Sequence, residues 1–247
     1  MPEPIARATS CALTLPTQES VLCVLVILTK GENVLIIANG AFKSGSTWQR
    51  NILSEIVDWK PIPPELRHPS LPHWLNDNRI GDALEGKCDD AIYLTKAHIR
   101  KETLYHRISQ ARNCKVFFIK RDLLDTLYSH YNHVVNQRSI KIPFNIYYMF
   151  IGRYKALQIY KYNKVWTSRA SENILISTYE ALKNDFNTEV KKYGDFLGVE
   201  LSASDLERIA ESTSIESSRA KSKHSWFFRR GVIGEGSKEI KSEWIKR

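Results

Sequence analysis

Residues 34–48 read Val-Leu-Ile-Ile-Ala-Asn-Gly-Ala-Phe-Lys-Ser-Gly-Ser-Thr-Trp, a short apolar run followed by a loop of Gly, Lys, Ser and Thr. The pattern predicts a strand that turns directly into a helix. The first N–H groups of such a helix have no partner within it, and the positive end of the helix dipole adds to them. Gly40 and Gly45 allow the backbone to approach a ligand closely, and Lys43 adds a full positive charge. The stretch therefore predicts a phosphate-binding loop.

The spacing of this loop nearly satisfies the Walker A pattern of Gly, four residues, Gly, Lys and Ser or Thr. Lys43, however, precedes Gly45 by two residues, and Ser46 stands where the Walker lysine would be. Ser44, Ser46 and Thr47 are expected to add hydroxyl donors to the same site. A Gly/Ser turn with a surface lysine remains the alternative for this motif taken alone.

Length and composition describe an ordinary globular protein with an unusual charge. The chain of 247 residues fits one α/β domain and is long enough to bury a core. Its 36 basic and 27 acidic residues give a net charge of +9. This charge favours anionic partners such as nucleotides, sulfated products, nucleic acid or an anionic membrane, and it does not choose among them. No interleaved basic and aromatic stripe typical of nucleic-acid binding is visible.

The cysteines and the N-terminal region bear on the compartment. No cysteine pair has the spacing of a zinc site or a disulfide framework, so we expect a reducing compartment and a cytoplasmic protein. The apolar run 21–28 is far shorter than the roughly 20 residues that span a bilayer. Residues 1–20 lack periodicity and are expected to be a loose extension, with 21–247 as a single domain. The cysteines are Cys11, Cys23, Cys88 and Cys114.

Hydrophobic periodicity predicts alternating strands and helices. The expected strands are 33–38, 91–95, 115–119 and 173–178, with 21–28 as a further edge strand. The expected helices are 46–58, 101–112, 123–136, 145–167 and 179–197. The alternation predicts an α/β protein with a three-layer P-loop-type fold, in which helices flank a central, mostly parallel sheet. The proline-rich segment 59–90 is expected to be a long ordered loop that shapes a pocket.

A second motif follows the strand predicted at 115–119. Arg121 lies just past the end of that strand, and Ser129 lies about two helical turns further on. An arginine and a hydroxyl placed in this way can hold one phosphate through charge-assisted hydrogen bonds. The alternative is that Arg121 pairs with Asp122 or Asp125 on the surface.

A third motif is Tyr93-Leu-Thr-Lys-Ala-His, at the end of another predicted strand. Lys96 and His98 are two residues apart, so their side chains can lean to the same side. A single histidine is more often exposed or a satisfied core group than a catalytic one.

The fourth motif lies near the C-terminus, where residues 226–235 read Trp-Phe-Phe-Arg-Arg-Gly-Val-Ile-Gly-Glu. Arg229 and Arg230 next to Gly231 favour the close approach of a phosphate. A basic surface turn is the alternative.

In order and spacing, the four motifs resemble those of sulfotransferases of the cytosolic type, which use 3′-phosphoadenosine 5′-phosphosulfate (PAPS). The resemblance runs from about residue 33 to 234. It implies that the Lys-Ser-Gly-Ser-Thr-Trp loop binds the 5′-phosphosulfate and that Trp48 stacks on the adenine. Asp125 and Tyr131 match family positions around the site that binds the 3′-phosphate of PAPS. The nucleotide-binding residues that it implies are Lys43, Ser44, Gly45, Ser46, Thr47, Trp48, Arg121, Ser129, Tyr179, Thr213, Arg229, Arg230 and Gly231.

The resemblance also implies a reaction. A sulfonate group would pass in line from PAPS to a hydroxyl or amine of a small-molecule acceptor, leaving adenosine 3′,5′-bisphosphate. His98 would act as the general base, and Lys43 and Lys96 would stabilise the developing negative charge. No metal is required, because lysines neutralise the leaving group. The sequence does not define the oligomeric state.

Two other functions stay open at this point. An ATP- and Mg²⁺-dependent small-molecule kinase could use a phosphate loop on the same kind of fold. A catalytically degenerate nucleotide-binding protein would retain the loop without the chemistry.

The chain departs from the family pattern at Phe42, Ala97 and Glu235-Gly236. The acceptor-pocket candidates are the aromatic residues Trp74, Tyr148, Tyr154 and Trp166.

Overall fold

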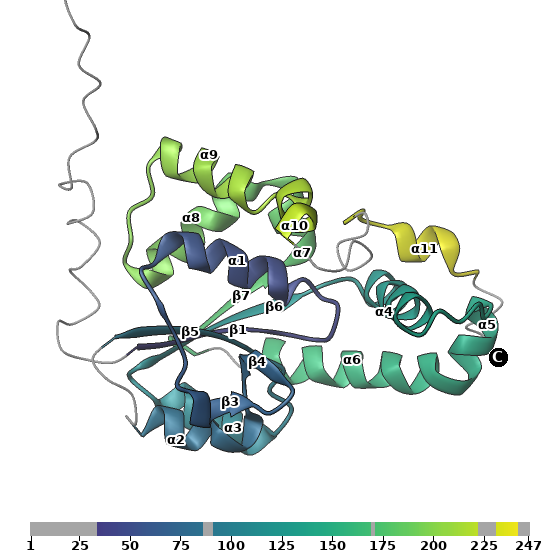
Figure 1. The fold of residues 1–247 in the computed structure, drawn as a ribbon, viewed down its shortest axis with the longest axis horizontal. Coiled ribbons are helices and arrows are strands. Elements are labelled where there is room, and N and C mark those ends of the chain that lie inside the picture. The colour runs from purple at the N-terminus through teal and green to yellow at the C-terminus, as the bar shows by residue number, and fades with distance from the viewer. Residues whose placement is uncertain (1–33, 86–90, 169–170, 222–230, 242–247) are drawn as a thin grey trace, which may run out of the picture.

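The computed structural model describes residues 34–85, 91–168, 171–221 and 231–241. Its strands form one sheet in the order β3-β4-β5-β1-β6-β7, with β2 also paired to β5 (Figure 1). All paired strands are parallel except β3 and β4. The strands are β1 (Val34–Gly40), β2 (Lys60–Pro61), β3 (Arg67–His68), β4 (Leu71–Leu75), β5 (Ile92–Ala97), β6 (Cys114–Lys120) and β7 (Ile174–Thr178).

Helices cover both faces of the sheet (Figure 1). One face carries α1 (Ser46–Ile56), α7 (Tyr179–Asn184), α8 (Phe186–Leu197) and α9 (Ala203–Ser212). The other face carries α2 (Ile80–Leu84), α3 (Glu102–Gln110) and α6 (Arg153–Thr167). The remaining helices are α4 (Leu123–Arg138), α5 (Phe144–Tyr147), α10 (Ile215–Lys221) and α11 (Glu235–Glu239), and short 3₁₀ turns cover Pro64–Leu66 and Asp77–Arg79.

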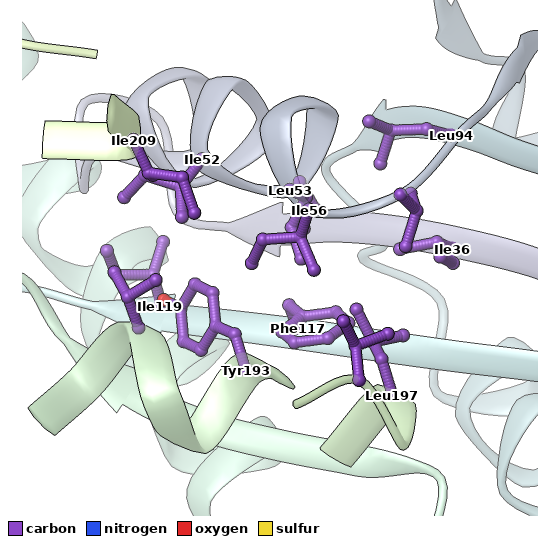
Figure 2. Close-up of a cluster of buried hydrophobic side chains, with 14 of the residues drawn as sticks. Ile36, Ile52, Leu53, Ile56, Leu94, Phe117, Ile119, Tyr193, Leu197 and Ile209 are labelled. Carbon is purple, nitrogen blue, oxygen red and sulfur yellow. The ribbon is translucent and has the colours of Figure 1, made fainter. Parts of the chain in front are cut away.

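The core lies on both sides of β1, which is buried along its whole length. Because side chains alternate along a strand, Ile36 packs under α1 and α8, whereas Ile37 packs on the side of α3 and α6. Figure 2 shows the first of these clusters, where Leu53 of α1 and Tyr193 of α8 pack over Phe117 of β6. A continuous apolar run is what a strand buried on both faces requires.

The predicted fold class is confirmed: a three-layer α/β arrangement with a mostly parallel central sheet. The strands predicted at 33–38, 91–95, 115–119 and 173–178 correspond to β1, β5, β6 and β7 within two residues at each end. The proposed edge strand 21–28 and the N-terminal extension 1–20 lie outside the described residues.

Two sequence-based predictions of local structure were wrong. The helix predicted at 179–197 is two helices, because Asp185 accepts the N–H of Thr188 and begins α8 with a new cap. The segment 59–90 is not a long loop in its described part. It contributes β2, β3, β4 and α2, and β4 extends the sheet in parallel beside β5.

The long helix predicted at 145–167 is present with one irregularity. α5 passes through a π-helical turn at Tyr148–Gly152 and continues as α6. Gly152 occurs in this turn, where an added Cβ would lie 2.9 Å from the Tyr148 ring. Such turns insert one extra residue and rotate the following face of the helix.

Candidate active site

The carboxyl ends of β1, β5, β6 and β7 meet at one edge of the sheet, because these strands are parallel neighbours. The residues that follow these ends are the loop after Gly40, His98, Arg121 and Tyr179. A cavity opens at this edge. Its lining combines members of all the described sequence motifs: Phe42, Lys43, Gly45, Ser46, Thr47, Trp48, Trp74, Lys96, Arg121, Ser129, Tyr179, Lys183, Thr213, Ile215, Ser218, Gly231 and Glu235.

The loop between β1 and α1 has the conformation of an anion site. Gly45 is the N-cap of α1 with φ +108°, and an added Cβ would lie 2.7 Å from the Tyr179 ring. Gly45 therefore cannot carry a side chain without displacing Tyr179. Lys43 also has a positive φ of 70°, a conformation that costs a non-glycine residue about 1 kcal/mol. The loop holds Lys43 at the cavity despite this strain.

Four predicted loop side chains line the cavity and one does not. Ser46, Thr47 and Trp48 are part of the lining together with Lys43. Ser44 is fully buried behind the loop, where its N–H donates to Ala41, and its Oγ would lie 2.5 Å from a Cβ added at Gly40. Ser44 is therefore not part of the cavity lining, and its contact with the nucleotide stays a prediction.

Lys96 points from β5 toward the same loop. Its Nζ donates a hydrogen bond to Thr47 Oγ1 at 2.7 Å and lies 4.5 Å from the centre of the Trp74 ring. Burial, with further contributions from Lys43 and Arg50, lowers the pKa of Lys96 to about 7. A bound anion would favour the charged amine and raise this pKa again. The ammonium group is thus positioned for an anionic ligand.

His98 follows β5 and is oriented by the phosphate loop. Its Nδ1 lies 2.5 Å from the carbonyl oxygen of Gly40. A carbonyl only accepts, so Nδ1 carries the proton and Nε2 has a free lone pair. Within the described residues, Nε2 is buried without a hydrogen-bond partner. Burial and the neighbouring Lys96 lower the pKa of His98 to about 3, so the ring is neutral.

Two aromatic rings of the cavity lining contact His98. Trp74 and Phe42 line the cavity, and their ring centres lie 4.5 Å and 6.0 Å from that of His98. Phe42 also meets His130 at 5.5 Å and His133 at 5.1 Å. Burial lowers the pKa of both of these histidines to about 4, so they contribute a neutral wall here.

Arg121 and Ser129 both line the cavity, as the second motif predicted. The Arg121 guanidinium donates to the carbonyl of Val232 at 2.9 Å and lies 4.2 Å from the centre of the Tyr179 ring. It is 3.7 Å from Asp125, and its side chain is only 9% exposed. The surface ion pair considered from the sequence is therefore a nearly buried contact beside the cavity.

Asp125 and Tyr131 have structural contacts that the sequence did not indicate. Asp125 accepts the N–H groups of Gly234 at 2.8 Å and Gly236 at 2.6 Å, which joins α4 to α11. An added Cβ at Gly236 would lie 2.2 Å from the backbone of Leu124, so this departure from the family pattern fits a close helix contact. Tyr131 donates to the carbonyl of Ile142 at 2.7 Å and is not part of the cavity lining.

The far wall of the cavity contains Tyr179, Thr213 and Gly231, as predicted. Gly231 has φ +63°, and an added Cβ would lie 2.8 Å from Tyr179 Oη. Arg229 and Arg230 lie outside the described residues.

Sequence reasoning missed several lining residues. Lys183 is one helical turn after Tyr179, a spacing that could have indicated it. Ile215 and Ser218 belong to α10, a short helix that the sequence pattern did not reveal. Glu235 was noted only as a departure from the family pattern.

Trp74 is the only one of the four aromatic acceptor-pocket candidates that lines the cavity. Trp166 is a core residue that is 1% exposed, and its indole N–H donates to the carbonyl of Ile99. Tyr154 is 67% exposed on the surface of α6, and Tyr148 stacks on Phe144. The prediction is wrong for Trp166, which is buried in the core, whereas the roles of Tyr148 and Tyr154 in an acceptor pocket stay predictions.

The charged groups of the cavity favour a polyanionic ligand. Among the described residues of its lining, Lys43, Lys96, Arg121 and Lys183 are basic, and one residue, Glu235, is acidic. Among the described residues, no group of His, Cys, Asp and Glu side chains is arranged to hold a metal ion. No helix in the described part of the chain is long and apolar enough to cross a membrane.

A parallel sheet whose first strand ends in a phosphate loop, beside a cation-lined cavity, defines a nucleotide-binding α/β protein of the P-loop type. Comparison with known protein families identifies the family within this class. The model of the sulfotransferase domain matches residues 32–247, so the chain belongs to the sulfotransferase family. The resemblance seen in the four motifs is thereby confirmed, and the chain is classed with the PAPS-dependent sulfotransferase enzymes.

Individual relatives are distant. Sulfotransferase 1E1 of Mus musculus is 23% identical over 218 residues, covering 78% of this chain and 73% of that protein. The crystal structure of mouse sulfotransferase SULT7A1, complexed with PAP, matches with a TM-score of 0.64 at 20% identity, over 87% of this chain and 80% of that one. Retinol dehydratase, in complex with androsterone and PAP, gives a TM-score of 0.61 at 17% identity, and the match covers 87% of this chain and 77% of that one. These structures support the shared fold.

Proposed function

We propose that this protein transfers the sulfonate group of PAPS to a hydroxyl or amine of a small-molecule acceptor. The observation that carries the proposal is one cavity lined by two separate groups of candidate phosphate-binding residues. We assign the 5′-phosphosulfate to the loop from Lys43 to Thr47, at the end of β1, and the 3′-phosphate to Arg121 and Ser129, which follow the end of β6. A nucleotide with a 5′ and a 3′ phosphate group needs two such sites, whereas ATP needs one.

In the proposed reaction, the bond between sulfur and the bridging phosphate oxygen breaks as sulfur bonds to the acceptor oxygen or nitrogen. Lys43 and Lys96 stabilise the negative charge that develops on the bridging oxygen, which leaves with the 5′-phosphate. The acceptor proton passes to Nε2 of His98, whose tautomer is set by the hydrogen bond to Gly40. The products are the sulfated acceptor and adenosine 3′,5′-bisphosphate.

The remaining nucleotide contacts follow from the cavity lining. Trp48 and Tyr179, with ring centres 5.5 Å apart, provide apolar surface for the adenine. Thr213 and Gly231 close the same end. Arg229 and Arg230 stay predictions for the 3′-phosphate.

A small-molecule acceptor is supported by the androsterone in the retinol dehydratase complex, a property of that protein. Trp74 and Phe42 offer an aromatic wall next to His98. A cytoplasmic location is proposed on the cysteine pattern; the one described cysteine, Cys114, is free and buried.

Calorimetry in the presence of a chelator tests the proposal. We expect adenosine 3′,5′-bisphosphate to bind at least about tenfold more tightly than AMP or ATP, because only it engages Arg121. Tighter binding of ATP with added Mg²⁺ would instead assign the chain to the kinases. Transfer from ³⁵S-labelled PAPS to a panel of phenols, alcohols and amines then separates an active enzyme from a degenerate nucleotide-binding protein.

A further inference from the structure

Most of the exposed large apolar side chains in the described part of the chain lie in one region. Of eleven such side chains, eight fall between residues 140 and 160. Phe150 is 75% exposed and Tyr154 is 67% exposed, more than any other large apolar side chain described. Contiguous exposed apolar surface marks an interaction site more often than scattered residues do. Six of these residues, here called the α6 face, are Ile146, Met149, Phe150, Tyr154, Leu157 and Tyr160.

The α6 face follows helical spacing, with steps of three, four and one residue through α5, the π turn and α6. The opposite side of α6 is fixed in the core, where Trp166 packs against the sheet and Ile159 is also buried. Tyr162 also bonds Asn39 of β1. Because the core side holds the helix in place, the apolar α6 face stays exposed. The helix α6 itself lies on the opposite side of the sheet from α1 (Figure 1).

The charge around this face has one sign. No acidic residue occurs between Asp125 and Glu172, and six basic residues fall within 138–164. Arg153, Lys161 and Lys164 are exposed on α6 itself. An outward helix face that combines aromatic and aliphatic side chains with only basic charges has the character of a helix that lies in a membrane interface.

We propose that the α6 face docks on the surface of an anionic lipid bilayer. The apolar side chains would enter the boundary between headgroups and acyl chains, and the basic side chains would contact lipid phosphates or carboxylates. A second copy of this chain fits the face poorly, because a two-fold interface would bring the same cations together. A nucleic acid fits it less well, because aliphatic side chains such as Met149 and Leu157 gain nothing from phosphate contacts. This proposal does not depend on the proposed reaction.

Co-sedimentation of the full chain with lipid vesicles tests the proposal. We expect binding to vesicles of phosphatidylcholine and phosphatidylserine to exceed binding to pure phosphatidylcholine by about tenfold or more, and to weaken as salt is raised. The variant Phe150→Ser/Tyr154→Ser should lose about tenfold in binding. Its matched control is Leu71→Ser/Ile176→Ser, which alters two exposed apolar residues outside the face, 39% and 37% exposed.

A second pair of variants distinguishes the effect of the basic residues on α6 from the effect of the net charge of the protein. The test variant is Arg153→Glu/Lys161→Glu/Lys164→Glu. Its control changes three exposed basic residues outside the face to Glu: Lys60, Arg112 and Lys191. Each triple variant lowers the net charge from +9 by six units to +3. Only the first should abolish vesicle binding, and thermal unfolding should show that all variants are folded. Equal binding to both vesicle types, or equal losses in variants and controls, would overturn the proposal. A dimer that depends on Phe150, or oligonucleotide binding that is tighter than vesicle binding, would also overturn it.

Discussion

The Nδ1 nitrogen of His98 is hydrogen-bonded to the carbonyl oxygen of Gly40, the last residue of β1. The phosphate loop begins at this glycine, so the residue that opens the phosphate site also selects the tautomer of the proposed base. His98 Nε2 is left with its lone pair. Substrate binding that moves the loop would therefore also move the base.

Replacement of His98 by alanine should lower sulfonate transfer by about 10² to 10⁴-fold, the usual contribution of a general base. The affinity for adenosine 3′,5′-bisphosphate should stay nearly unchanged, because His98 is not among the residues that line the nucleotide cavity. Transfer from labelled PAPS and calorimetry on the same preparation measure the two effects. Full activity in the variant would exclude His98 as the base. A carboxylate such as Glu55, which forms an ion pair with Arg208 at 2.8 Å, would then be the next candidate.

The pH dependence of kcat/KM should show no acid limb near 6.5 from His98. Its pKa is lowered to about 3 by burial and by Lys96, so the imidazole is already neutral well below neutral pH. The base form is thus fully present above about pH 4 in the free protein. Initial rates measured across pH 5 to 8 at low PAPS check this. An acid limb near 6.5 would place His98 in contact with water rather than in the buried position described.

Lys96 should make the nucleotide affinity fall as the pH rises. Its pKa is lowered to about 7, so the free protein loses this positive charge as pH rises through 7. We expect affinity for adenosine 3′,5′-bisphosphate to fall above pH 7, by at most about tenfold per pH unit, with proton uptake on binding. Calorimetry in buffers of different ionisation enthalpy measures the uptake. Lys96→Arg should remove the pH dependence, because guanidinium stays charged; proton uptake that persists in this variant would point to another group.

Two glycine substitutions should differ in their effects on the site. Gly45→Ala would combine a φ of +108° with a Cβ only 2.7 Å from the Tyr179 ring, so nucleotide binding should fall by about tenfold or more. Gly234→Ala is the control, because φ is also positive there at +76° but no described atom lies within 4 Å of the added Cβ. Backbone strain alone should cost the control about 1 kcal/mol of stability. Equal nucleotide affinities in both variants would contradict the anion-site geometry at Gly45.

Removal of the Asp125 carboxylate should detach the C-terminal helix from α4. Asp125→Ala leaves the N–H groups of Gly234 and Gly236 without their acceptor, a loss of about 3 kcal/mol in the free energy of unfolding. Asp205→Ala is the control, since Asp205 forms an exposed capping box with Ser202 worth about 1 kcal/mol. Urea unfolding of both variants measures the difference. A smaller loss at Asp125 than at Asp205 would show that the link to α11 is not important for stability.

Much of the site could be predicted from sequence because its residues directly follow strands. Lys96, His98 and Arg121 each stand at or just past the end of an apolar run, and parallel strands bring such ends to one edge. The phosphate loop is likewise local, because Gly45 and the start of α1 are adjacent in the chain. The helix break at Asp185 was not predicted, because the hydrophobic pattern continues through this residue although its side chain caps the start of α8.

Other features depended on contacts between distant segments. Trp166 looks like a pocket aromatic in sequence, yet packing on Phe118 and Tyr105 places it in the core. The sequence offers no sign that Asp125 accepts N–H groups more than a hundred residues away. The orientation of Ser44 and the lining role of Ile215 likewise depend on how α10 and the loop pack.

Sequence alone is enough to predict the parallel α/β fold, the phosphate loop after β1 and the order of the charged groups that follow the other strands. These features come from periodicity and from backbone chemistry within a few residues, which act wherever the segment lies. The tertiary structure decided which side chains reach the cavity, which nitrogen of His98 keeps its proton, and which face of α6 stays outside. Those outcomes depend on burial and on hydrogen bonds between residues far apart in the chain, which only the packed sheet and its helices bring together.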